Sequence, residues 1–409
     1  MKILHTLAVL LTCLGLISCN ANKDSDDFHQ SLLTVDTHTD TPMLLTGSDY
    51  DLSVRHDPEG ILKKLDFPRM KEGGLDGVFF AVYVEQGNLS PEEREGAKEK
   101  ALVTFDTIHK TIENNSDLVE LALCSDDLKR INKKDKLAIF IGIENGYPIG
   151  KDITMVEHFY DLGARYITLC HSGNNDICES STDKDDPEMD GLSEFGEDVV
   201  KEMNHLGMII DVSHISDKSF FDVLELTKAP VMASHSSARA IWPNPRNLSD
   251  TMLIALAENG GVIQVCAYSM FIKEKPFPAR DSAISEVFEK HGNYYELPPD
   301  KKALFLEDYY RIDSIFPAKL ATVSDFVDHI DHIVDIIGID HVGIGTDFDG
   351  GGELEDCYDV SEFPNITEEL IKRGYSNEEI QMIWSGNFLR VFKEVENISD
   401  NKHSAFKVQ

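Results

Sequence analysis

The chain has 409 residues, of which 42% are hydrophobic, enough for a sizeable core in one large domain or in two or three smaller ones. Its 73 acidic and 38 basic residues give a formal net charge of −35. Such a charge repels nucleic acid and anionic membrane surfaces, so neither is expected as a partner. The acidic excess itself indicates a solvated surface and names no substrate.

The first residues have the composition of a targeting signal. Residues 1–18 combine one early positive charge with a mostly apolar stretch, and Cys19 follows directly. This pattern resembles a bacterial lipoprotein signal, cleaved before a cysteine that is then lipidated; an ordinary secretory signal is the alternative. We expect residues 19–30 to form a lipidated tether to the bacterial cell envelope, on its periplasmic or outer-membrane face and not in the cytoplasm. No later stretch has the apolar length of a membrane span, so the lipid is the only membrane attachment expected.

The remaining cysteines carry little information. Once Cys13 and Cys19 are set aside, the number left is odd and no C-x-x-C occurs. Neither a disulfide scaffold nor a cysteine-ligated zinc site is therefore indicated.

Apolar runs of strand length alternate with helical stretches along residues 31–397, which we interpret as one catalytic domain. Strands are predicted over residues 32–35, 77–84, 137–143, 166–169, 208–212, 231–233, 262–267 and 342–345. Helices are predicted over residues 58–71, 91–114, 155–162, 193–206, 216–227, 252–258, 323–336, 366–372 and 377–395. Residues 269–318 interrupt the alternation with prolines, charges and aromatics, and we interpret them as an insertion carrying its own helices. Residues 398–409 form a tail.

About eight strand–helix units predict one parallel sheet, either a closed barrel or a doubly wound sheet. Polar residues at the ends of many strands favour the barrel, because only closure brings widely separated strand ends around one axis. The predicted fold class is α/β: a (β/α)8 TIM-type barrel with an insertion after the seventh strand and extra C-terminal helices.

A histidine or a carboxylate stands at the end of six of the predicted strands. The first such pair is His38 and Asp40, which share a face because they lie two residues apart in an extended chain. The other strand-end residues are Glu144, His171, His214, His235, Asp347 and Asp349. Each alone is explained equally well by a capped loop or a turn. Their shared position at one end of a barrel predicts a common site.

Histidine and carboxylate ligands without thiolates suit Zn²⁺ or a similar divalent ion. Three histidines and two carboxylates exceed what one open catalytic ion needs. Two ions bridged by one carboxylate, with a hydroxide held between them, account for all five ligands.

From the first strand onward, the chain resembles the membrane dipeptidase (renal dipeptidase) family of zinc peptidases, the M19 type. The resemblance covers nearly the whole mature chain. Its motifs are His38-x-Asp40, Glu144 within IGIE-x-G, His171, and the runs GLSEFGEDVVKEMNHLGMIIDVSHIS, ASHSSARAIWPNPRNLSD and GIGTDFDG.

The resemblance implies a (β/α)8 barrel with two Zn²⁺ per chain. His38 and Asp40 would bind one ion, His214 and His235 the other, and Glu144 would bridge both. It also implies that His171, Arg246 and Asp347 bind substrate. Thr37, Thr39 and Asn145 depart from the residues usual in the family, and because they flank ligands they affect the shape of the pocket rather than metal binding.

The predicted activity is hydrolysis of a dipeptide by the metal-bridging hydroxide. His171 would donate to the oxyanion, Asp347 would carry the proton to the leaving amine, and Glu144 completes the catalytic set. Arg246 would hold the free C-terminal carboxylate with two parallel hydrogen bonds, Arg239 being the structural alternative.

Two other functions remain open at this point. One is another binuclear metal amidohydrolase, acting on lactams or N-acyl amino acids. The other is a non-catalytic lipoprotein that binds peptides or metal. The preferred dipeptides, tolerance of D-residues, the native metal and the oligomeric state, a homodimer included, are also open.

Overall fold

The computed structural model describes residues 25–46, 50–58, 60, 62–183, 190–273, 277–292, 297, 299–317 and 319–399. The predicted signal, Cys19 and the first part of the tether lie outside these residues, as does the tail beyond residue 399. Within the described ranges, no helix is both long and apolar enough to cross a membrane.

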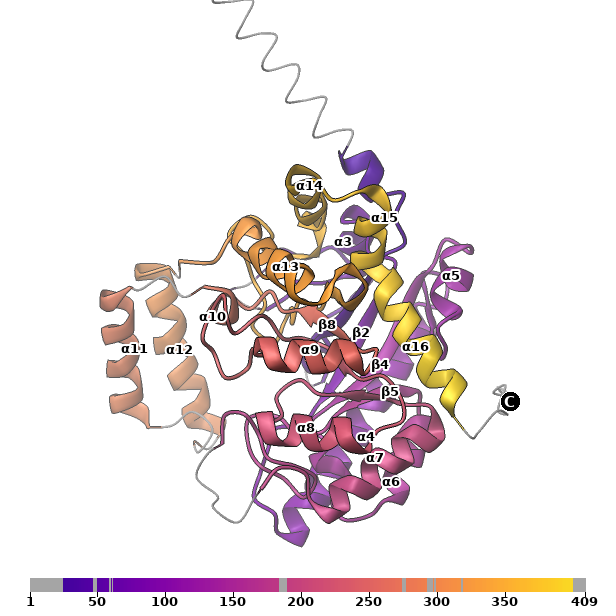
Figure 1. Cartoon of the computed structure of the whole chain (residues 1–409). Helices are drawn as coiled ribbons and strands as arrows, with labels where there is room; N and C mark the ends of the chain where they lie inside the picture. Colours follow the sequence, from indigo (N-terminus) through magenta and orange to yellow (C-terminus); the bar gives the residue numbers. More distant parts are fainter. Residues whose placement is uncertain are drawn as a thin grey trace, which may run out of the picture.

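The core of the molecule is a parallel sheet that curls into a nearly closed barrel (Figure 1). Its strands follow the order β1-β2-β4-β5-β6-β7-β8-β9. Their bounds are β1 (Val35–Thr39), β2 (Gly77–Tyr83), β4 (Leu137–Glu144), β5 (Ala164–Thr168), β6 (Ile209–Asp211), β7 (Met232–Ala233), β8 (Val262–Val265) and β9 (Val342–Ile344). The first and last strands meet where Thr39 pairs with Phe348 and the Asp347 N–H donates to the His38 carbonyl at 3.0 Å. The predicted TIM-type fold class is confirmed.

Helices cover the outside of the barrel. They include α4 (Pro91–Asn114), α6 (Thr154–Asp161), α7 (Glu194–Leu206), α8 (Asp217–Leu226), α9 (Asp250–Glu258), α13 (Val323–Ile337) and α14 (Pro364–Arg373). Short 3₁₀ turns lie at Tyr147–Ile149, Ile339–His341 and Val360–Glu362. Several helices begin at a serine whose hydroxyl accepts a backbone N–H three residues on: Ser90, Ser193, Ser216 and Ser249. These caps place the loop before each helix, and the loops at the C-terminal ends of the strands carry the polar residues predicted to form the site.

The interior of the barrel is filled by apolar side chains at one end only. Val35, Ile209, Met232 and Val262, each at or near the start of its strand, pack in one cluster with the apolar face of α16 (Asn387–Ile398). Helix α16 therefore closes the N-terminal end of the barrel. The C-terminal end is left to polar side chains.

Four local features differ from the prediction. The chain forms an additional strand, β3 (Val119–Leu121), and helix α5 (Asp127–Asn132), both missed. Strands β3 and β5 pair with the same edge of β4. Strand β5 pairs from Ile141 onward, and β3 pairs with the start of β4, which β5 leaves free. The helix predicted over residues 58–71 is reduced to α3 (Phe67–Glu72), which begins where the Asp66 side chain caps it.

The third difference concerns the C-terminal helices. The single helix predicted over residues 377–395 is divided into α15 (Asn377–Gln381), a π-helical turn (Met382–Gly386) and α16. The first predicted strand also lies later than expected, since β1 runs through His38 to Thr39.

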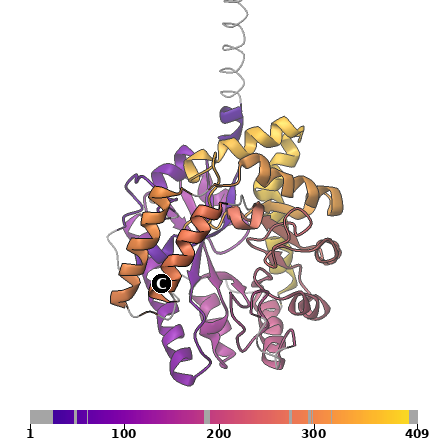
Figure 2. The same ribbon diagram turned by 90° about the vertical axis from the view of Figure 1, so that its left-hand side faces the viewer.

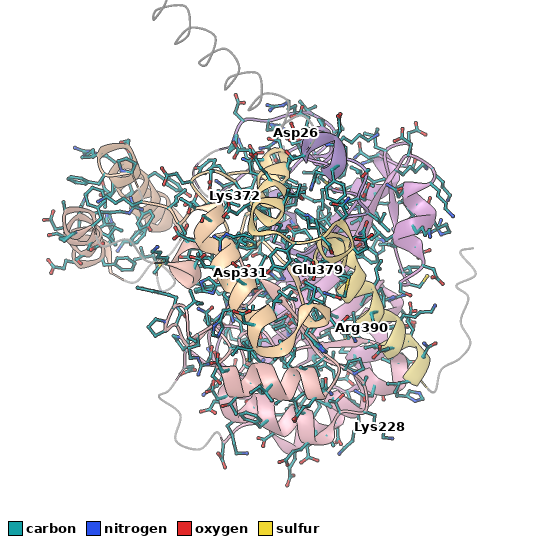
Figure 3. The ribbon with its side chains drawn as sticks, turned by 45° about the horizontal axis from the view of Figure 1, so that its top comes forward. Asp26, Lys228, Asp331, Lys372, Glu379 and Arg390 are labelled. Carbon is teal, nitrogen blue, oxygen red and sulfur yellow. The ribbon has the colours of Figure 1, made fainter. Side chains whose placement is uncertain are left out.

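The predicted insertion contains helices, as expected: α10 (Ser269–Ile272), α11 (Pro278–His291) and α12 (Pro299–Ile315). Helices α11 and α12 pack on each other around Val287, Phe305 and Ile312, a cluster separate from the barrel core. They stand out from the barrel at the left of Figure 1 and of Figure 3, and lie in front of the strands in Figure 2. A short helix, α2 (Pro42–Leu45), follows β1.

Candidate metal centre

The strand-end residues predicted from the sequence meet at the C-terminal end of the barrel. His38 lies in β1 and Asp40 directly after it, and Glu144 is the last residue of β4. Four others lie two or three residues beyond β5, β6, β7 and β9: His171, His214, His235 and Asp347. All are buried except His171, whose side chain is 21% exposed.

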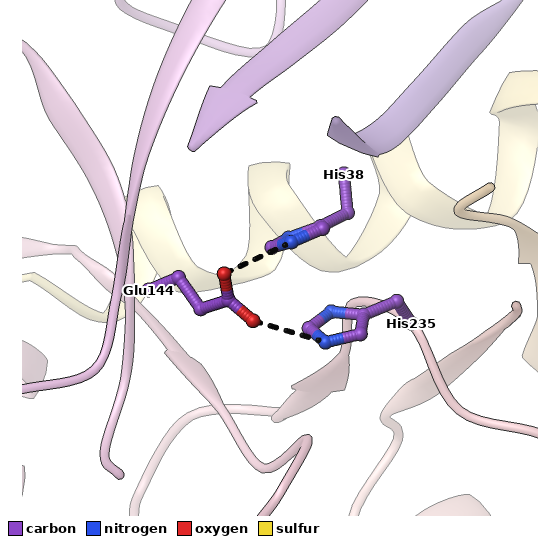
Figure 4. Close-up of side chains that lie close together, drawn as sticks. All are labelled: His38, Glu144 and His235. Carbon is purple, nitrogen blue, oxygen red and sulfur yellow. Dashed lines mark ion pairs between the residues drawn. The ribbon is translucent and has the colours of Figure 1, made fainter. Parts of the chain in front are cut away.

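The Glu144 carboxylate faces the imidazoles of His38 and His235 (Figure 4). Its Oε2 lies 3.5 Å from His38 Nε2, while its Oε1 lies 3.0 Å from His214 Nε2 and 3.4 Å from His235 Nε2. His171 Nε2 is 3.6 Å from the same Oε1. The two carboxylate oxygens of one side chain therefore face different sets of imidazoles.

Two further carboxylates surround His38. One oxygen each of Asp40 and Asp347 lies 3.9 Å from His38 Nε2. A Cβ at Gly350 would collide with both carboxylates, so this close approach needs a residue without a side chain. Potential ligand atoms thus fall into three groups, each within 4.8 Å: His38, Glu144 and His235; Glu144, His171 and His214; and His38, Asp40 and Asp347.

The backbone is held in an unusual conformation at this end of the barrel. Asn145, His214 and Asp347 have φ of 80°, 70° and 63°, in the left-handed region that non-glycine residues rarely occupy. Such conformations cost about 1–3 kcal/mol each and concentrate at functional sites. Here they aim His214 and Asp347 into the cluster.

Several buried polar atoms of the cluster have no hydrogen-bond partner within the part of the chain that the structure describes. They are His38 Nε2, Asp40 Oδ1, Glu144 Oε2 and His214 Nδ1. In addition, His214 Nε2 and His235 Nε2 lie only 2.8 Å apart. Buried polar atoms nearly always have a hydrogen-bond partner. These atoms are imidazole nitrogens and carboxylate oxygens, the kinds of ligand atom that bind Zn²⁺. The donor set fits a divalent cation.

Burial shifts the ionisation of these groups in opposite directions. It raises the pKa of Asp347 to about 7 and raises that of Asp40, where Glu144 and Asp347 add like-charge repulsion. It lowers the pKa of His214 and His235 well below the usual value. For Glu144, the neighbouring imidazoles outweigh burial and lower the pKa. Neutral His214 and His235 and an ionised Glu144 are in the protonation states that bind a metal. His38 differs, because burial, which alone would lower its pKa, is outweighed by Glu144 and Asp347, which raise its pKa.

Arg246, in the loop before α9, reaches the same site. Its guanidinium is buried, Nη2 donates to the His235 carbonyl at 3.2 Å, and the group lies 5.2 Å from the centre of the Phe271 ring. Its Nε and Nη1 have no hydrogen-bond partner among the described residues. Arg239 instead forms a two-pronged pair with Asp217 at 2.7 Å, at the protein surface. The structure therefore separates the two arginines, and only Arg246 presents donors to the cluster.

Asp349 follows Asp347 by two residues but plays a different part. Its carboxylate accepts the Thr41 hydroxyl at 2.6 Å and the Lys64 N–H at 2.8 Å. It therefore joins the loops after β1 and β9, and it is outside the three ligand groups.

Sequence patterns missed a set of buried polar residues behind the cluster. Tyr166 places its hydroxyl 2.8 Å from His38 Nδ1, and its ring occupies space that any Cβ at Gly142 would fill. Ser234 contacts His235 Nδ1 at 2.7 Å and Asp211 at 2.6 Å. The available signal is that Asp211 is a carboxylate at the end of the otherwise apolar strand β6.

A buried cluster of imidazoles and carboxylates at the C-terminal end of a parallel barrel defines the class of metal-dependent barrel hydrolases. The sequence narrows the class further, because residues 23–405 match the family model of membrane dipeptidases (Peptidase family M19). The chain belongs to this family, and it is an enzyme of the metallo-dipeptidase type.

Individual relatives agree with the family assignment. The chain is 31% identical over 380 residues to "Dipeptidase tcpJ" of Claviceps purpurea (strain 20.1), covering 91% of this chain and 79% of the relative. It is 32% identical over 388 residues to "Dipeptidase 3" of Homo sapiens, covering 93% and 68%. The crystal structure of the probable dipeptidase PvdM from Pseudomonas aeruginosa superposes with a TM-score of 0.80 at 29% identity, covering 93% of this chain and 99% of that one.

Proposed function

We propose that the chain is a zinc-dependent dipeptidase that cleaves dipeptides carrying a free C-terminal carboxylate. The observation that carries the proposal is the position of Glu144, with one oxygen toward His38 and the other toward His214 and His235. Such a carboxylate suits a bridge between two ions. His38 and Asp40 would complete one ion's ligands, and His214 and His235 the other's.

When bound, two divalent ions supply Lewis-acid polarisation of the scissile carbonyl and acidify the attacking water. The protein's own residues do the rest. Asp347, whose pKa burial raises to about 7, can accept the proton of that water and return it to the leaving amine. His171, the more exposed imidazole at the site, is placed to donate to the developing oxyanion, an effect worth about 3 kcal/mol.

Arg246 accounts for the selection of dipeptides. Its Nε and Nη1 have no partners among the described residues, and each can act together with the second N–H of Nη2 as a two-donor edge that matches a carboxylate. A fixed carboxylate subsite one residue beyond the scissile bond excludes longer peptides and C-terminal amides. This feature favours a dipeptidase over a hydrolase of lactams or N-acyl amino acids, and the complete ligand set argues against a binding protein without activity.

The test is a library of dipeptides with L- and D-residues at each position, assayed on purified protein with and without added zinc. We expect hydrolysis that a chelator abolishes and zinc restores, two zinc ions per chain, and no cleavage of the matching dipeptide amides. Glu144→Gln serves as the inactive reference. Equal cleavage of amides and free acids would contradict the carboxylate subsite, and metal-independent hydrolysis would contradict the whole proposal.

We further infer that Cys19 is lipidated and that the lipid holds the enzyme in the bacterial cell envelope. Support comes from the apolar segment that precedes Cys19 and the polar residues that follow it. A Cys19→Ser variant should leave the membrane fraction and fail to incorporate labelled fatty acid. If the variant stays with the membrane, the inference is wrong.

A further inference from the structure

Behind the metal centre, Asp211 collects hydrogen bonds from described residues on three neighbouring strand ends. Its Oδ1 accepts the backbone N–H groups of Ser213 at 3.0 Å and Ser234 at 2.9 Å. Its Oδ2 accepts the hydroxyls of Ser234, at 2.6 Å, and Thr168. Asp211, Thr168 and Ser234 are all fully buried. A carboxylate accepts and does not donate, so the direction of each of these bonds is fixed.

The direction of the bond from Ser234 to Asp211 also determines the direction of the bond between Ser234 and His235. The single hydroxyl hydrogen of Ser234 goes to Asp211, because the two oxygens lie 2.6 Å apart, the carboxylate has no hydrogen to give, and the Ser213 hydroxyl is farther away at 3.5 Å. The Ser234 oxygen lies 2.7 Å from His235 Nδ1, so Nδ1 must carry the hydrogen of that bond. A neutral imidazole protonated at Nδ1 has its lone pair at Nε2, the nitrogen 3.4 Å from Glu144 Oε1.

The three histidines proposed as metal ligands differ in this respect. His38 Nδ1 has only a tyrosine hydroxyl beside it, which can donate or accept. His214 Nδ1 has no partner among the residues described. His235 alone of the three is connected through a hydroxyl to a carboxylate.

We propose that Asp211 and Ser234 are positioning residues that lock His235 in the Nδ1–H tautomer and thereby prepare its Nε2 for metal. The inference rests on the proposed function, because it takes His235 as a ligand. Hydrogen-bond partners behind a histidine ligand fix its tautomer and ring orientation, and losing them typically weakens metal affinity by about 10- to 100-fold.

We call the hydrogen bonds that lead from Asp211 through Ser234 to His235 the relay. Asp211→Asn tests the direction of these bonds, because asparagine has nearly the shape of aspartate. The two backbone N–H donors cannot reverse, so the asparagine oxygen must face them and its NH₂ must face the hydroxyls of Thr168 and Ser234. Those hydroxyls can rotate to accept. The Ser234 hydrogen is then free to point to His235 Nδ1, which favours the Nε2–H tautomer and opposes metal binding.

The experiment compares wild type with Asp211→Asn, Ser234→Ala and the matched control Ser237→Ala, a buried serine whose hydroxyl contacts the Cys266 carbonyl instead. Histidine tautomers are identified by long-range ¹H–¹⁵N spectra of the chelator-treated, histidine-labelled protein. Zinc affinity is measured by competition with a chromophoric chelator. We expect His235 to change from Nδ1–H to Nε2–H in Asp211→Asn, and zinc affinity to fall about 10- to 100-fold in both relay variants but not in Ser237→Ala.

His235→Ala separates the possible failures. If it binds zinc as wild type does, the proposed metal centre is wrong. If it loses zinc while Ser234→Ala binds as tightly as Ser237→Ala, or if Asp211→Asn keeps the Nδ1–H tautomer, the centre stands and the relay is overturned. If Asp211→Asn does not fold, the zinc affinity of Ser234→Ala, compared with that of Ser237→Ala, tests the relay.

Discussion

Two groups of buried histidines lie in this molecule, one at the strand ends and one elsewhere. His29 and His329 are as buried as His214 and His235, and burial lowers the pKa of all four, to about 4 for His29 and His329. Neither burial nor the direction of the pKa shift therefore distinguishes a structural histidine from a candidate ligand.

The partners of the ring nitrogens do distinguish them. His329 Nδ1 accepts the Ala238 N–H at 3.0 Å and its Nε2 donates to the Ile272 carbonyl at 2.9 Å. His29 is likewise bonded at both nitrogens, to Thr367 and to the Gly73 carbonyl. At the strand ends, ring nitrogens face other nitrogens and a shared glutamate, and some have no partner within the described chain. Satisfied histidines hold the fold together, whereas the strand-end histidines are left able to bind something else.

The largest predicted effect contrasts one histidine from each group. His214→Ala should lower kcat/KM by about 10⁴-fold or more, because it removes one member of a set that acts as a unit. His329→Ala should instead lower the free energy of unfolding by about 2–4 kcal/mol, since it leaves a cavity and two unpaired backbone groups, with kcat retained. Dipeptide kinetics and urea unfolding measure both. The contrast fails if His329→Ala is inactive while fully folded.

A second contrast is available within the motif around Asp347. Asp347→Asn should lower kcat by about 10³-fold with zinc retained, because an amide cannot take a proton from the water. Asp349→Asn, its matched control, should keep kcat and lose stability, since Asp349 joins two loops through Thr41 and Lys64. Kinetics together with metal analysis test the pair, and equal kcat in the two variants would remove Asp347 from the mechanism.

A smaller effect is expected at the arginines. Arg246→Ala should raise KM by about 10- to 100-fold, as expected for the loss of a hydrogen-bonded charge worth roughly 1.5–3 kcal/mol, and should keep its metals. Discrimination between dipeptides and their amides should disappear as well. Arg239→Ala, whose partner Asp217 lies at the surface, should leave KM unchanged. An Arg246→Ala variant that still rejects amides would place the carboxylate elsewhere.

The sequence was sufficient to predict the barrel and most residues of the cluster. Strand-length apolar runs with a histidine or carboxylate at their ends predict both the barrel and the members of the cluster, because parallel strands end on the same face. The sequence could not predict β3, a strand of 3 residues that pairs only with the start of β4, nor the break of the last helix at a π-turn. These depend on tertiary pairing and not on local pattern.

Within the cluster, residue type and spacing do not separate neighbours of the same kind, and the choice of Asp347 and Arg246 came from the family resemblance alone. Asp347 and Asp349, or Arg239 and Arg246, are alike by residue type and close in the chain. Their partners separate them: Asp349 accepts from Thr41 and Lys64 whereas Asp347 faces His38, and Arg239 pairs with Asp217. These partners are properties of the folded chain. The same holds for Asp211 and Ser234, whose importance depends on where their hydrogens point.

The last prediction sharpens the comparison of the two groups of histidines through pH. A histidine whose pKa in the folded state is about 4, against an ordinary value near 6.5, contributes nothing to the pH dependence of stability above pH 6.5. As the pH falls from 6.5 to 4, the unfolded chain binds a proton that His329 in the folded chain resists, so the free energy of unfolding falls, by up to about 3 kcal/mol. His329→Asn, which keeps an acceptor for the Ala238 N–H, should remove that part of the acid sensitivity.

Urea unfolding of both proteins at several pH values measures the difference. Chelator is present throughout, so that metal release from the strand-end histidines does not contribute. Parallel stability curves for the two proteins would mean that His329 takes up its proton within the fold, and the distinction between satisfied and unsatisfied histidines would then lose its energetic basis.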